Sequence, residues 1–119
     1  MSNSIVANKA SVFAVRVTKA YKYLCETHKR IALFYQFLRS GTAIGALAHE
    51  AIHAQSRKDF ANKMNIALKE ANETYYWIQV IHDGGYINEK SFKSILHDCN
   101  ELVSMLVKIV KTTKLSIEK

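Results

Sequence analysis

The chain has 119 residues, of which 49% are hydrophobic and 23% are charged, and it contains 4 glycines and no proline. This length and composition describe one ordered domain with a modest core, and they exclude a disordered tail or a flexible linker. The formal net charge of +7 suits an anionic partner such as nucleic acid as well as it suits a merely solvated surface.

Neither a membrane span nor a secretion signal is evident in the sequence. No apolar run approaches the roughly 20 residues that cross a bilayer, and residues 1–17 lack a basic segment followed by an apolar core and a cleavage site. Cys25 and Cys99 stand alone within apolar patterns, which is typical of buried, reduced thiols rather than of a disulfide or a metal site. We therefore expect a cytoplasmic protein.

The first two helices are predicted from apolar residues that recur at steps of three and four. Residues 8–26 carry one such stripe on a segment that is otherwise basic. The stripe consists of Phe13, Val17, Tyr21 and Leu24. Residues 31–55 begin with apolar side chains around most of the circumference, which indicates a helix that is buried on more than one side.

The third helix is predicted over residues 57–83, where the same rhythm persists for six turns. Ser56, with Asp59 three residues later, is expected to cap its first turn by accepting a hydrogen bond from a free amide. Gly84 or Gly85 is expected to end the helix, because glycine takes the left-handed conformation at little cost.

The fourth helix is predicted over residues 89–114, with Asn88 as its N-cap. Ile87 and Phe92 are spaced as a hydrophobic staple around that cap. No stretch of useful length alternates with the period of a strand. We therefore predict an all-α protein in which residues 1–119 form a single antiparallel up-down four-helix bundle.

Positions 38–51 of the second helix contain an unusual number of small residues. Gly41, Gly45 and Ala48 lie nearly above one another, and each glycine costs about 1 kcal/mol relative to alanine inside a helix. Close approach of another helix would offset that cost, because small side chains let two backbones come near each other. The approaching helix is either the one across the bundle or one from a neighbouring subunit, and the sequence leaves both open.

The segments "QFLRSGTAIGALAHEA", "QSRKDFANKMNIALKEANETYYWIQVI" and "GYI" resemble a family of bacterial four-helix-bundle proteins. That family was first noticed as reading frames in intervening sequences of 23S ribosomal RNA genes. The resemblance extends over about residues 10–114. It departs from the family at Ala43, where serine is usual, and at Leu47, where asparagine is usual.

The resemblance implies an up-down bundle that commonly assembles into a ring-shaped homopentamer. A more distant similarity is to the accessory protein of diversity-generating retroelements, a basic pentameric bundle that binds a reverse transcriptase and nucleic acid. Most of the family has no established biochemical activity, and neither likeness supplies catalytic residues.

The sequence "HEAIH" matches the H-E-x-x-H motif of zinc proteases, with His49 and His53 one helical turn apart and Glu50 between them. Glu73 is spaced as a conceivable third ligand. However, such proteases hold their substrate against an edge strand, and none is predicted here. Only the glutamate of the motif recurs in the family pattern. We therefore expect no catalytic residue, no metal site and no cofactor.

The block "KEANETYYW" contains two further groups of interest. Glu70 and Glu73 are expected to pair with cations on neighbouring helices, such as Arg39, because buried or half-buried acids need a partner. Tyr76 and Trp77 are consecutive with Tyr75 and fan out around the helix, so at least one of them points away from the core. Such an aromatic residue would suit an oligomer interface.

The positive charge is concentrated in the first and last helices. No acid precedes Glu26, and none lies between Glu101 and Glu118. Neighbouring first and fourth helices would bring their cations into one candidate patch for phosphates. That patch would consist of Arg16, Lys19, Lys22, Lys108, Lys111 and Lys114. We expect a non-catalytic homo-oligomer that binds RNA or a nucleic-acid–protein complex; the alternative is a protein–protein adaptor without nucleic-acid affinity.

Overall fold

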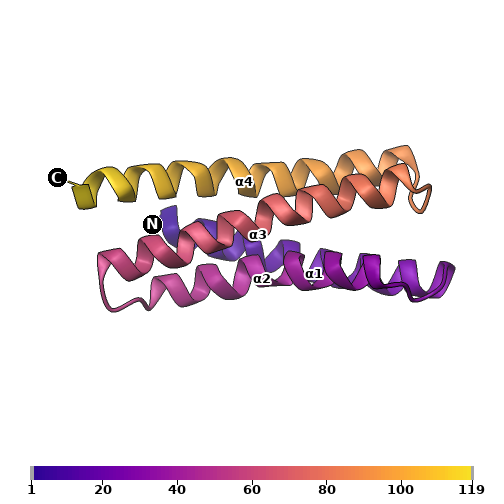
Figure 1. Cartoon of the computed structure of the whole chain (residues 1–119), viewed down its shortest axis with the longest axis horizontal. Coiled ribbons are helices and arrows are strands. Elements are labelled where there is room, and N and C mark those ends of the chain that lie inside the picture. The colour runs from indigo at the N-terminus through magenta and orange to yellow at the C-terminus, as the bar shows by residue number, and fades with distance from the viewer. Residues whose placement is uncertain (1, 119) are drawn as a thin grey trace.

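The computed structural model describes residues 2–118 as four helices that run antiparallel in sequence order (Figure 1). They are α1 (Ser2–Thr27), α2 (Ala32–Ile52), α3 (Arg57–Asp83) and α4 (Glu89–Glu118). Together they form a rod with principal extents of 50 × 22 × 21 Å. The predicted all-α, up-down four-helix architecture is confirmed.

The helix ends differ from the predicted ones at three places. α1 begins at Ser2 instead of residue 8, and α4 continues to Glu118 instead of residue 114. Neither segment contains glycine or proline, and Val6 is fully buried, so tertiary packing extends the helix beyond its obvious apolar stripe. α2 ends at Ile52 instead of residue 55, because the chain must reverse before the cap of α3 at Ser56.

The caps lie where the sequence predicts them. The Ser56 hydroxyl accepts a hydrogen bond from the Asp59 amide at 3.0 Å, and the Asn88 side chain accepts one from the Ser91 amide at 2.8 Å. Of the two glycines after α3, Gly85 adopts the left-handed conformation, with φ of 85°. These local signals fix the turn before α3 and the turn between α3 and α4.

One continuous apolar core runs along the rod and contains one polar contact that sets a register. The Thr74 hydroxyl lies 2.9 Å from the Ser40 hydroxyl and 2.8 Å from the Glu70 carbonyl oxygen. Both side chains are fully buried, so this pair aligns α2 with α3 in one position. Every helix exposes a polar face, and none in the described part is both long and apolar enough to cross a membrane.

The fourth side of the bundle is more open than the other three. α1 packs along α2, α2 along α3 and α3 along α4, whereas α1 and α4 contact each other only sparsely. Figure 1 shows the same arrangement, with α1 beside α2 and α4 beside α3. This seam between α1 and α4 is where the predicted basic helices meet.

Candidate nucleic-acid interface

Carboxylates of α4 neutralise the cations of α1 in the middle of the rod. Lys9 Nζ lies 3.2 Å from a carboxylate oxygen of Glu101. The guanidinium of Arg16 lies 2.5 Å from an Asp98 oxygen and donates a second bond of 2.8 Å to the Ser94 hydroxyl. Arg16, one of the predicted phosphate-binding residues, is therefore already engaged across the seam.

The other predicted cations lie on opposite halves of the rod. Lys108 follows Asp98 by ten residues, which places it about 15 Å farther along α4 at about 1.5 Å per residue. Because α1 is antiparallel to α4, Lys19 and Lys22 lie from Arg16 in the opposite direction. The structure thus does not bring the six residues into one patch, since ion pairs separate the two groups.

The start of α3 adds two cations to the group at the end of α4. Arg57 and Lys108 line one groove between α3 and α4, together with Phe60. Lys58 and Lys114 line the neighbouring groove. All of these cations are exposed. We call this surface the basic end; it consists of Arg57, Lys58, Lys108, Lys111 and Lys114.

The basic end carries little compensating negative charge. Asp59 lines the groove beside Lys58, and none of the five cations forms an ion pair with another described residue. The first turn of α3 adds a partial positive charge from its unpaired amides. The arrangement suits phosphate groups, which lysine contacts as a point charge without reading bases.

Sequence reasoning missed Arg57 and Lys58. Both precede the apolar stripe of α3, and Asp59 next to them balances the charge along the chain. The signal that would have found them is topological: α3 and α4 are antiparallel neighbours, so the first turn of one lies beside the last turns of the other.

The zinc-protease motif serves as a connection between helices. His49 Nε2 lies 2.8 Å from the Ser11 hydroxyl on α1, and Glu50 lies 3.1 Å from Lys63 Nζ on α3. His53 is exposed and is the C-cap residue that follows α2. Among the side chains that the structure describes, no group of three or more His, Cys, Asp or Glu residues is placed to hold a metal ion.

Arg39 bridges the two acids of the "KEANE" block, as predicted. Its guanidinium lies 3.3 Å from Glu70 and 2.5 Å from Glu73. The hydrogen bond to Glu73 is the main cause of the raised pKa of Arg39. This bridge joins α2 to α3 on the outside of the bundle.

The small residues of α2 face α1 of the same chain. A Cβ on Gly41 would lie 2.8 Å from both methyl carbons of Val17, and one on Gly45 would lie 3.3 Å from the carbonyl oxygen of Ala10. Ala48 is fully buried in the same contact face. Of the two partners that the sequence left open, the helix within the bundle is the one these three residues approach.

Of the two predicted aromatic residues of α3, Tyr76 points outward and Trp77 is half-buried against the core. Tyr76 is 56% exposed, and its ring meets that of Trp77 edge to face at a centroid distance of 5.0 Å. Trp77 Nε1 is buried and has no hydrogen-bond acceptor among the described residues. Tyr35 on α2 is also more than half exposed.

The two cysteines lie in different surroundings. Cys99 is fully buried, and burial raises the pKa of its thiol to about 12, so it stays protonated at neutral pH. Its sulfur lies 3.5 Å from the Ala71 carbonyl oxygen. Cys25 is half-buried, and both cysteines are free.

Comparison with known proteins supports the family resemblance. The family model of the 23S rRNA-intervening sequence protein matches residues 2–108. A protein of unknown function from the S23 ribosomal protein family of Bacteroides thetaiotaomicron VPI-5482 has a similar crystal structure, with a TM-score of 0.90 and 46% sequence identity. That match covers 93% of this chain and 99% of the other. No curated protein matches. With nearly its whole length matched, the chain belongs to the family of 23S rRNA-intervening sequence proteins.

Proposed function

We propose that this protein is a non-catalytic homo-oligomer that binds RNA through the basic end. The observation that carries the proposal is the group of five exposed, unpaired cations that the start of α3 and the end of α4 bring together at the basic end. Contacts there would go to phosphates, so binding would depend on charge and shape rather than on base sequence. We propose RNA as the polyanion, because the family description names 23S rRNA, and with such a target we expect the protein to act in the cytoplasm.

The distribution of ion pairs explains why the excess positive charge lies near the two ends of the rod. Most carboxylates of the chain are paired with a cation or a histidine, and all of these but Glu50, which pairs with Lys63 near the start of α3, lie away from the basic end. These carboxylates are Glu50, Glu70, Glu73, Asp83, Glu89, Asp98 and Glu101. The excess of +7 is therefore not spread evenly over the surface. A local excess attracts polyanions more strongly than the same charge dispersed.

Exposed apolar residues on two sides of the rod support assembly into a ring. α1 exposes Val12 (72%) and Val15 (55%), while Tyr76 is exposed on α3. α1 and α3 lie diagonally across the bundle, because each packs on α2 and α4 but not on the other. A closed ring needs two different complementary faces on each subunit, unlike a two-fold dimer. We propose the homopentamer that the family resemblance implies.

A ring would also strengthen RNA binding. Several basic ends held at fixed spacing could engage one RNA molecule, and each contact after the first would be intramolecular. Weak individual sites made of a few lysines would then give a useful overall affinity.

Salt dependence of RNA binding tests the proposal. Each phosphate contact to a single strand contributes about −0.7 to the slope of log K against log salt. Five contacts per engaged subunit therefore predict a loss of roughly 100-fold between about 50 and 200 mM salt. Replacement of Lys108, Lys111 and Lys114 by glutamine should reduce that loss to about sevenfold. Fluorescence anisotropy of a labelled single-stranded RNA gives both values.

A matched variant removes the same charge from the other end of the rod. Replacement of Lys19, Lys22 and Lys29 by glutamine should leave most of the affinity and of the salt slope intact. Equal losses in the two triple variants would contradict a site at the basic end. Absence of RNA binding at low salt, with the oligomer intact by light scattering, would favour the alternative of a protein–protein adaptor.

A further inference from the structure

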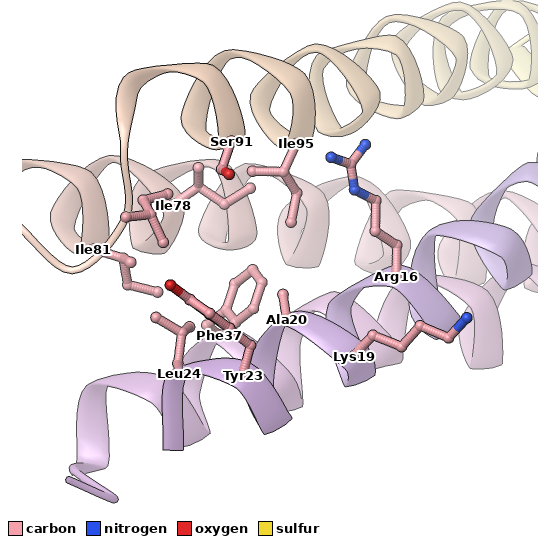
Figure 2. A pocket seen from close by; sticks show the side chains of 11 residues that line it. Arg16, Lys19, Ala20, Tyr23, Leu24, Phe37, Ile78, Ile81, Ser91 and Ile95 are labelled. Atoms are coloured by element: carbon pink, nitrogen blue, oxygen red, sulfur yellow. The ribbon is translucent and has the colours of Figure 1, made fainter. Parts of the chain in front are cut away.

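The seam between α1 and α4 opens into an apolar pocket beside the turn that joins α3 to α4. Its volume is about 440 Å³, and side chains from all four helices line it (Figure 2). Leu24, Phe37 and Ile78 belong to its floor, and all three are almost fully buried. Small-molecule sites are typically hollows of roughly 300–1,000 Å³ with apolar walls and a few polar groups.

Two small side chains face the pocket from opposite sides of the seam, where a closed bundle would place large ones. Ala20 on α1 and Ser91 on α4 line it from the two sides of the seam. α1 and α4 contact each other only sparsely, so no neighbouring side chain fills the space between them. The hollow is therefore built into the packing of the bundle rather than left by a single missing side chain.

Arg16 closes one end of the pocket. It lines both this pocket and a second hollow farther along the seam, and its bonds to Asp98 and Ser94 cross the seam between the two. A partner helix lying along the seam would have to break that bridge. A compact ligand fits on one side of the bridge without disturbing it.

The charge at the end of the pocket near Arg16 and Lys19 determines which kind of ligand the pocket suits. Figure 2 shows Arg16 and Lys19 at the end of the pocket away from Leu24. Lys19 is exposed and has no ion pair among the described residues, and no carboxylate lines the pocket. The Arg16 guanidinium beside it is already paired with Asp98, so Lys19 supplies the uncompensated positive charge.

We propose that the pocket binds a small amphipathic carboxylate. Its apolar chain lies against the buried floor, where it leaves water, and its carboxylate lies at the Lys19 ammonium beside the Arg16 guanidinium. This site goes beyond the proposed RNA binding and does not depend on it, because it lies on the opposite half of the rod from the basic end.

Calorimetric titration of the full chain with decanoate, below its micelle-forming concentration, tests the site. We expect saturable binding of one decanoate per chain and weaker binding of decyltrimethylammonium, which has the same chain and the opposite charge. Lys19→Glu should weaken decanoate binding by about fivefold or more, since it removes and reverses an exposed charge contact. Lys22→Glu makes the same charge change on the same helix outside the pocket and should change the affinity by less than about twofold.

Ala20→Leu tests the apolar part of the pocket, because it places a larger side chain in the hollow. It should weaken the binding of both decanoate and decyltrimethylammonium. Equal effects of the two lysine variants, or binding of many decanoate molecules per chain, would overturn the proposal. A change in oligomer mass in Ala20→Leu without loss of decanoate binding would show that the hollow is a protein contact. Thermal melting by circular dichroism verifies folding; if Ala20→Leu does not fold, the two lysine variants decide.

Discussion

Replacement of Gly41 by alanine is expected to destabilise the bundle, although alanine is the better helix former. The added Cβ would lie 2.8 Å from Cγ1 and Cγ2 of Val17. Ordinary contacts between carbon atoms are about 3.5–4.0 Å, so one of the two helices has to move. Val17 is β-branched and fully buried, which leaves it no alternative rotamer free of contacts.

The magnitude follows from two opposing contributions. Overpacking a well-filled core costs about 1–3 kcal/mol, whereas exchanging glycine for alanine in a helix gains about 1 kcal/mol. We therefore expect a net loss of about 1 kcal/mol in the free energy of unfolding. Urea denaturation followed by circular dichroism measures it, at one fixed protein concentration because oligomerisation shifts apparent stability.

A double-mutant cycle separates the two contributions. In a Val17→Ala background the two methyl contacts are absent and only the Cβ of residue 17 remains close, at 3.3 Å, so Gly41→Ala should stabilise the protein by up to about 1 kcal/mol. Ala46→Gly, at an exposed position of the same helix, reports the helix-propensity contribution alone. Additive effects of the Gly41 and Val17 substitutions, or a stabilising Gly41→Ala in the wild-type background, would refute the close approach of α1.

Three further predictions concern other parts of the bundle. The hydrogen bond to Glu89 is the main cause of the raised pKa of His82, so the contact stabilises the fold fully below about pH 6.5 and loses this effect as the pH rises through the folded-state pKa. Urea midpoints of the wild type should therefore fall relative to those of Glu89→Gln over that range. A constant difference between the two proteins would contradict the contact. Thr74→Val should cost about 1 kcal/mol by leaving the buried Ser40 hydroxyl with only its long hydrogen bond of 3.4 Å to the Phe37 carbonyl oxygen, and adding Ser40→Ala should restore part of that loss in the same assay. No recovery would argue against coupling. Val12→Lys should lower the oligomer mass in light scattering while changing thermal stability of the chain little, and an unchanged mass would exclude this face of α1 from the interface.

The elements of the fold were predictable because their signals are local. Ser56 and Asn88 cap the helices that they precede, and Gly85 ends α3, since each acts on its own turn of backbone. The Arg39 bridge was also predictable, because a half-buried acid has few possible partners other than a cation on the next helix. Val6 was missed because an apolar stripe does not reveal how far tertiary contacts extend a helix.

The arrangement of the charges was not predictable in the same way. Arg16 and Lys108 are both basic and lie on neighbouring helices, but their separation depends on the register of α1 against α4. That register is set by contacts between residues about 80 positions apart, such as Arg16 with Asp98. Charge along the chain therefore identified the basic helices, whereas only the packing of α3 on α4 revealed the basic end with Arg57.

The open seam has a consequence for any ligand that binds there. The bridges Lys9–Glu101 and Arg16–Asp98 are more than a third exposed on both sides, so each contributes at most about 1 kcal/mol. They align α4 with α1, while the buried stripe of α4 against α3, which includes Cys99, holds α4 in place. Because little of the folding free energy comes from the seam, a ligand can enter it and substitutions can fill it without unfolding the bundle.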